Sequence, residues 1–297
     1  MNNCQTGILQ PLPKHSRYMS FYLEPESAHP EKIKSTLQEL TEVVDGDRLV
    51  MGVGPSLLQA LGVSIEGMRV FPVMSGPGFD IPSTPTALWC WLRGDDRGEL
   101  YHQSRAMEQI LFPDFNLGHV LDSFMFADSR DLSGYEDGTE NPKGDEAVQA
   151  AIVSGQGKGM DGSSFVAVQQ WVHDLDVLQE KSPQEQDDII GRHRSDNEEF
   201  AEAPESAHVK RTAQESFDPD AFILRRSMPW TEGTDAGLNF VAFGKSFAAF
   251  EAILHRMVGA EDGISDALFS FTRPVTGAYF WCPPMKGNKP DLSSLAC

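Results

Sequence analysis

Residues 17–23 read R-Y-M-S-F-Y-L, and residues 165–172 read F-V-A-V-Q-Q-W-V. Both runs are rich in aromatic and apolar side chains, and the second alternates as a strand does, so each predicts a β-strand. From each of these strands the chain continues through the same order of predicted elements: helix, strand, strand, helix, strand. This repeated order, with an insertion in the second half between Arg192 and Asp220, decides the predicted fold.

The predicted helices follow apolar residues at helical spacing or a Ser-Pro start, and they span 30–44, 101–111, 182–191 and 247–257. The other predicted strands are short apolar runs at 48–53, 88–92, 120–127, 222–226, 238–243 and 278–282. A split β-α-β unit of this kind is the ferredoxin-like plan. Two copies predict an α+β protein with two antiparallel sheets, each covered by helices on one face, in the manner of a dimeric α/β-barrel.

The two halves share little similarity residue by residue, so the predicted duplication rests on element order alone. A glycine-rich joint at 155–164 separates a first domain, 1–150, from a second domain, 151–297. The joint contains G-K-G-M-D-G, but a strand follows it where a dinucleotide site needs a helix, so we interpret it as a flexible connection. Residues 180–205 carry nine Asp and Glu against three Lys and Arg, which predicts a solvated loop.

Composition excludes several classes of protein. The chain has 297 residues, 40% of them hydrophobic, and a formal net charge of −20, so it can bury a large core and repels phosphate backbones. Nucleic acid is therefore not an expected partner. No apolar run approaches the roughly 18 residues of a membrane span, and no signal peptide is visible. The four cysteines form no C-x-x-C pair, which favours reduced thiols and a cytoplasmic location.

The most informative loop is 134–142, which reads G-Y-E-D-G-T-E-N-P. Gly134 and Gly138 allow backbone angles closed to other residues, and Asn141-Pro142 restricts the chain that follows. Because a predicted strand precedes it, this loop can hold the carboxylate of Asp137 in a fixed place. The alternative is an ordinary surface turn, since these residue types are common in turns.

Two further segments offer polar groups next to apolar runs. His208 lies in E-S-A-H-V-K-R, where the acidic stretch ends, although a lone histidine is more often structural than a ligand. Residues 222–230 read F-I-L-R-R-S-M-P-W, and adjacent arginines on a strand point to opposite faces. The inward arginine must find an anion or a ligand, because an unpaired buried charge is costly. An inward arginine beside Asp137 would form a catalytic constellation.

Taken together, these three segments resemble the dye-decolorizing peroxidase family, and most closely its compact bacterial, cytoplasmic branch. The resemblance covers nearly the whole chain: the loop at 134–142, H-x-x-R at 208–211 and R-R-S-M-P-W at 225–230 occur in the family's order. It implies two ferredoxin-like domains and one haem b per chain. It also implies reduction of hydrogen peroxide and one-electron oxidation of aromatic or dye-type donors, with an acid pH optimum.

The resemblance assigns roles to individual residues. His208 becomes the proximal haem ligand, and Asp266 the acceptor for its other N–H, although a helix or turn N-cap explains Asp266 equally well. Asp137 and Arg225 flank the peroxide, with Ser227 placed to bind a distal water. Arg192 and Arg211 are the candidate cations for the haem propionates, with Arg192 favoured. Leu238, Phe240 and Phe243 are the candidate apolar walls of the pocket. Dipole stabilisation of a helix end explains Arg192 as well, and core packing explains the apolar three.

Two other functions remain open from the sequence. A non-catalytic haem protein for binding or transfer would keep His208 without needing Asp137 beside Arg225. A deferrochelatase, which removes iron from haem, is a further alternative. The sequence does not identify the physiological donor or the surface aromatic residue that passes its electron inward. Homo-oligomerisation is expected because ferredoxin-like sheets commonly pair.

Overall fold

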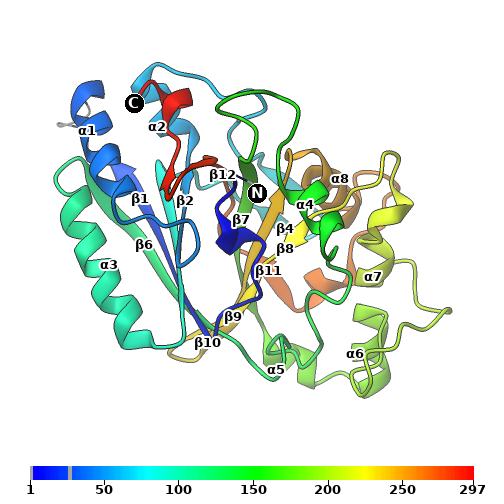
Figure 1. The fold of residues 1–297 in the computed structure, drawn as a ribbon. Coiled ribbons are helices and arrows are strands. Elements are labelled where there is room, and N and C mark those ends of the chain that lie inside the picture. Colours follow the sequence, from blue (N-terminus) through cyan, green and yellow to red (C-terminus); the bar gives the residue numbers. More distant parts are fainter. Residues whose placement is uncertain (1–2, 26–28) are drawn as a thin grey trace.

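One sheet of ten strands organises the part of the chain that the computed structural model describes, residues 3–25 and 29–297 (Figure 1). The fold is α+β, as predicted. In chain order the strands of this sheet are β1 (His15–Leu23), β2 (Leu49–Val53), β5 (Leu88–Gly94), β6 (Phe115–Phe124), β7 (Ser164–His173), β8 (Leu224–Arg225), β9 (Met228–Glu232), β10 (Asp235–Gly244), β11 (Thr272–Pro274) and β12 (Ala278–Cys282).

The repeated element order of the sequence gives a repeated strand order. Strands of the first half lie in the order β6-β1-β5-β2, and those of the second half in the order β12-β7-β10-β9, all antiparallel. Single pairings, Ser123 with Trp230 and Val53 with Trp281, join the halves at both edges and close the sheet. Two separate sheets were expected. Closure is favoured because it pairs edge strands that would otherwise expose backbone N–H and C=O groups.

Aromatic side chains fill the interior of this closed sheet. Trp89 and Trp91 of β5 both stack on Tyr18 of β1, with ring centroids 6.1 and 5.9 Å apart. Phe243 of β10 packs against the same two tryptophans, so core packing, the second of the two explanations offered for it, accounts for this residue. Since side chains alternate along a strand, an interior Phe243 places Leu238 and Phe240 on the outer face.

The helices cover the outer faces. Helices α1 (Pro30–Thr41) and α3 (Arg97–Leu111) pack together on the first half, and α8 (Ala248–Met257) packs on β10 in the second (Figure 1). The shorter elements are α2 (Pro55–Leu61), α4 (Asp145–Ala151), α5 (Leu175–Gln179), α6 (Pro183–Ile190), α7 (His208–Arg211), the 3₁₀ turns η1 (Thr6–Ile8), η2 (Gln214–Ser216), η3 (Ala267–Ser270) and η4 (Ser293–Leu295), and the hairpins β3 (Met74–Gly76) with β4 (Phe79–Ile81) and β13 (Met285–Lys286) with β14 (Lys289–Pro290).

The strand expected at 120–127 begins earlier and ends at Phe124, and a strained turn follows it. Ala127, Asp128 and Ser129 have φ angles of 38°, 59° and 76°, three consecutive non-glycine residues in the left-handed region. Each such residue costs about 1 kcal/mol or more, so the surrounding contacts must hold this turn. Among the described residues, no helix is long and apolar enough to cross a membrane.

Candidate active site

A cavity of about 250 Å³ lies on the outer face of β7 and β10, under α7, α8 and the loop 131–140. Strand alternation builds its floor, because Gln169, Trp171 and His173 share one face of β7 while Leu238 and Phe240 share the same face of β10. Leu238 and Phe240 therefore lie where the sequence placed them. Helix α8 contributes apolar side chains to the opposite wall, from Phe250, Ile253, Leu254 and Met257.

The loop at 134–142 is more than a surface turn. Gly134 and Gly138 have φ angles of 94° and 84°, which favour glycine. A Cβ at Gly134 would also lie 3.0 Å from Cδ of Arg194, so only glycine fits without displacing that side chain. The backbone N–H of Asp137 donates to the carbonyl of Ser129 at 3.0 Å. These constraints aim the carboxylate of Asp137 into the cavity.

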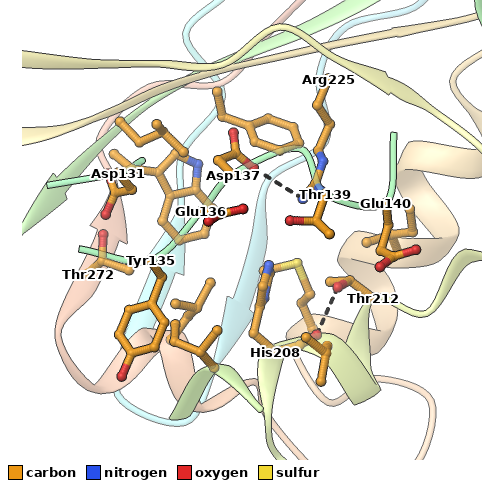
Figure 2. A pocket seen from close by; sticks show the side chains of 18 of the residues that line it. Asp131, Tyr135, Glu136, Asp137, Thr139, Glu140, His208, Thr212, Arg225 and Thr272 are labelled. Atoms are coloured by element: carbon orange, nitrogen blue, oxygen red, sulfur yellow. Dashed lines mark hydrogen bonds and ion pairs between the residues drawn. The ribbon is translucent and has the colours of Figure 1, made fainter. Parts of the chain in front are cut away.

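Asp137 meets Arg225 as predicted. One carboxylate oxygen of Asp137 lies 3.4 Å from the Arg225 guanidinium, and both side chains, about one-fifth exposed, line the cavity (Figure 2). Asn141 fixes this pair in a way that the sequence did not reveal. Its Oδ1 accepts from the Arg225 backbone N–H at 2.8 Å, and its Nδ2 donates to the Arg225 carbonyl at 3.0 Å. The loop and the arginine strand are thus tied together.

The neighbouring arginine faces the other way. Arg226 donates from Nε and Nη2 to the carbonyls of Ile8 and Leu9, both at 3.0 Å. Burial, with a smaller contribution from nearby Arg93, lowers the pKa of Arg226 to about 10. The two adjacent arginines therefore point to different places. Arg225 lines the cavity, and Arg226 donates hydrogen bonds to backbone carbonyls of the N-terminal segment.

His208 begins α7 on the opposite side of the cavity from Asp137 and Arg225 (Figure 2). Its Nδ1 lies 2.7 Å from Oδ2 of Asp266, a carboxylate with no solvent exposure. The other oxygen of Asp266 accepts from the Leu268 N–H at 2.8 Å, so Asp266 caps η3 as well. Asp266 therefore contacts His208 and caps the turn, and its role as partner of a haem ligand stays a prediction. With Nδ1 engaged, Nε2 is the ring nitrogen of His208 that remains for a ligand.

The three other predicted polar residues have different outcomes. Arg192 lines the cavity, where its guanidinium contacts Glu140 at 2.6 Å and Glu199 at 3.1 Å. Arg211 lies outside the lining, because two 2.7 Å bonds engage its guanidinium with the carboxylate of Asp262.

Ser227 is likewise absent from the described lining. It is buried, and its hydroxyl accepts from the Val241 N–H at 3.4 Å. A strand that continued through 227 would place Ser227 on the face of Arg225, but β8 ends at Arg225 and β9 begins only at Met228. These contacts do not support Arg211 as a cofactor-binding cation or Ser227 as a distal group, and both roles stay predictions.

A second polar cluster in the wall escaped the sequence. His173 contacts Asp131 through Nε2 at 3.0 Å and Thr272 through Nδ1 at 2.6 Å. Nearby, the Tyr135 hydroxyl donates to Asp187 at 2.6 Å, which ties the loop to α6. Local sequence gave no signal for either contact, because the partners are 42 and 52 residues apart in the chain.

Comparison with known proteins decides the family. The model of the family described as "Dyp-type peroxidase, C-terminal" matches residues 128–287, more than half of the chain. The chain belongs to the Dyp-type peroxidase family. The matched range includes Asp137, His208 and Arg225, so all three segments of the proposed site lie within it. The resemblance drawn from the sequence is confirmed, and the protein is a peroxidase, an oxidoreductase.

Relatives of known name agree with this membership. A dye-decolorizing peroxidase of Mycobacterium tuberculosis is 28% identical over 243 residues, which are 80% of this chain and 70% of the relative. A solved structure of a putative Dyp-type peroxidase from Shewanella oneidensis is 29% identical, with a TM-score of 0.87 over 99% of this chain and 98% of that one. A DypB variant from Rhodococcus jostii in complex with heme is 25% identical, with a TM-score of 0.82 over 93% and 95% of the two chains.

Proposed function

We propose that this Dyp-type peroxidase binds one haem b in the cavity, reduces hydrogen peroxide and oxidises aromatic donors in one-electron steps. The observation that carries the proposal is the arrangement of the Asp137–Arg225 pair across the cavity from His208. The solved relative from Rhodococcus jostii, described as a complex with heme, supports the choice of cofactor.

The ligands present suit haem better than a bare metal ion. Within residues 3–25 and 29–297, no group of three or more His, Cys, Asp or Glu side chains could hold a metal ion. A porphyrin brings four nitrogen ligands of its own, so one axial histidine is sufficient. His208 has the carboxylate partner that orients such a ligand and raises its basicity. Leu238, Phe240 and α8 offer apolar walls, and Arg192, which lines the cavity while its guanidinium contacts Glu140 and Glu199, is the candidate cation for a propionate.

The residues opposite His208 match the needs of peroxide reduction. When bound, the haem supplies the electrons for breaking the O–O bond. That cleavage requires a proton moved from the inner to the outer oxygen, and positive charge where the leaving hydroxide forms. The Asp137 carboxylate can accept and return that proton. The Arg225 guanidinium, permanently cationic, stabilises the developing negative charge. A non-catalytic haem carrier has no use for this pair.

Peroxide turnover by the haem-loaded protein tests the proposal. We expect hydrogen peroxide to be consumed with an aromatic donor, and Arg225→Leu to retain haem while slowing the peroxide step about 100- to 1,000-fold. Arg105→Leu, on the exposed face of α3, is the matched control and should not change the rate. Absence of turnover by the haem-loaded wild type would contradict the proposed reaction at this cavity. Release of iron with accumulation of metal-free porphyrin would instead favour the deferrochelatase.

The domain boundaries, the location and the oligomeric state are further parts of the proposal. We propose ferredoxin-like domains at 1–150 and 151–297, supported by the matching strand orders of the two halves. The loop at 134–142 precedes that boundary yet completes the cavity of the second domain. A cytoplasmic location and homo-oligomerisation are proposed on sequence grounds, and light scattering of the purified protein would measure the oligomeric state.

A further inference from the structure

A buried histidine–carboxylate pair stands at the edge of the cavity, where the loop carrying Asp137 meets the sheet. His173 is the last residue of β7, and Thr272, its paired neighbour, is the first of β11. Asp131 lies at the start of the loop. All three line the cavity, and Figure 2 shows Asp131 and Thr272 together on the side of Asp137 away from Arg225. The side chains of His173 and Asp131 are only 5% and 13% exposed.

Two contacts fix the ring of His173. The Thr272 hydroxyl oxygen lies 3.0 Å from the Val172 carbonyl and 2.6 Å from Nδ1 of His173, so a hydroxyl that donates to the carbonyl accepts from Nδ1–H. Burial raises the pKa of Asp131, but hydrogen bonds from His173 and Ser133 outweigh it and leave that pKa below its ordinary value. The carboxylate of Asp131 lies 3.0 Å from Nε2 of His173 and accepts from an Nε2–H. In this arrangement both ring nitrogens carry a proton.

The pair secures a strained piece of backbone. Asp131 lies two residues after the left-handed turn at 127–129. Its backbone N–H donates to the Tyr135 carbonyl, and its carbonyl accepts from the Gly134 N–H, both at 2.8 Å. Asp137 in turn bonds back to Ser129. Residues 129–137 therefore form one closed unit, and the Asp131 carboxylate attaches it to the sheet. Such a turn persists only while its surroundings hold it.

We propose that His173 is a positioning residue of the active site: as an imidazolium ion-paired with Asp131, it holds the loop that aims Asp137. The Asn141–Arg225 contact fixes the far end of the same loop, so the two attachments set the separation of Asp137 from Arg225. The charge state and the attachment stand on contacts of the protein alone. The effect on the reaction rests on the proposed peroxidase function.

The charge state is tested by NMR on haem-free wild-type protein with ¹⁵N-labelled histidine at pH 7. Two similar ring-nitrogen shifts for His173, each with a bound proton, are expected, and the His173→Gln spectrum identifies the signal. A neutral ring, with one unprotonated nitrogen of widely different shift, would overturn the assignment. This measurement needs no cofactor.

The attachment is tested with His173→Gln, which keeps an amide donor but removes the positive charge. In haem-free protein we expect amide hydrogen exchange in the peptide 128–138 to accelerate about tenfold or more, while a peptide from β10 is unchanged. In haem-loaded protein the rate with peroxide should fall about 10- to 100-fold with the donor KM unchanged, because an ångström of misplacement is enough for such a loss. His119→Gln, an exposed histidine on β6, is the control.

Unchanged exchange in 128–138, or an unchanged peroxide rate in an active enzyme, would refute the positioning role. A wild type that binds haem but does not turn over peroxide would refute the proposed function instead. The hydrogen-exchange and NMR results would then still decide the attachment by themselves.

Discussion

Replacing Asn141 by alanine should both destabilise the protein and misalign Arg225. The change removes two hydrogen bonds, to the backbone N–H and carbonyl of Arg225, at 2.8 and 3.0 Å. At about 1 kcal/mol each, the loss is about 2 kcal/mol in the free energy of unfolding, or roughly a 30-fold shift in the folded-to-unfolded ratio. Without this tether the 3.4 Å contact between Asp137 and Arg225 loosens, and the peroxide step should slow about 10- to 100-fold.

Urea unfolding of the haem-free protein measures the first effect, and the midpoint should fall with an unchanged m-value. Rapid mixing with peroxide after haem loading measures the second. Asn116→Ala is the matched control: its exposed side chain bonds, among the described residues, to Glu24 alone, so the loss should stay within about 0.5 kcal/mol. If Asn141→Ala costs no more than this control and reacts with peroxide at the wild-type rate, the tether does not set the geometry.

Three other predictions follow from the same contacts. His208→Ala should abolish the haem Soret band of the purified protein, and retention of haem with unchanged axial spectra would move the ligand elsewhere. Asp266→Asn should weaken haem binding about 10- to 100-fold, measured by haem titration, because the ligand loses its carboxylate partner. Hydrogen bonds from Arg211 and from the Ile264 N–H lower the pKa of Asp262 to about 2. The Arg211–Asp262 pair therefore stabilises the fold fully above the ordinary pKa of 3.8, and this contribution disappears as the pH falls to about 2. The unfolding midpoint should therefore drop across that interval, and less so in Asp262→Asn.

The sequence predicted the site wherever one segment carried its own signal. Glycines at 134 and 138 fit the left-handed angles they adopt, and an Arg-Arg pair on a strand did place its members on opposite faces. The pairing of Asp137 with an inward arginine was predicted from the strand pattern, and the family resemblance then pointed to Arg225 and to His208 as the residue in need of a partner such as Asp266. Strand alternation could also have removed Phe243 from the pocket, since it differs in parity from 238 and 240.

The predictions that the contacts do not support concern Arg211 and Ser227, and they share a cause. The partner of a polar side chain depends on the tertiary structure. Arg211 looked available for a cofactor because Asp262 lies 51 residues away in the chain. Ser227 was placed by assuming an unbroken strand, and the break after Arg225 has no strong sequence mark. Asn141 and His173 were missed as contacts for the same reason, because each bonds to a residue that only the folded chain brings near.

The contacts that Arg226 makes matter for protein engineering. It joins the strand of Arg225 to the carbonyls of Ile8 and Leu9, more than 200 positions earlier in the chain. A change in the first ten residues, such as a deletion or a bulky fusion, can therefore shift the Arg225 guanidinium in the cavity without touching any residue of the cavity lining. Remote substitutions that alter catalysis would be expected to collect in this N-terminal segment. Its sequence should be preserved when variants of the enzyme are compared.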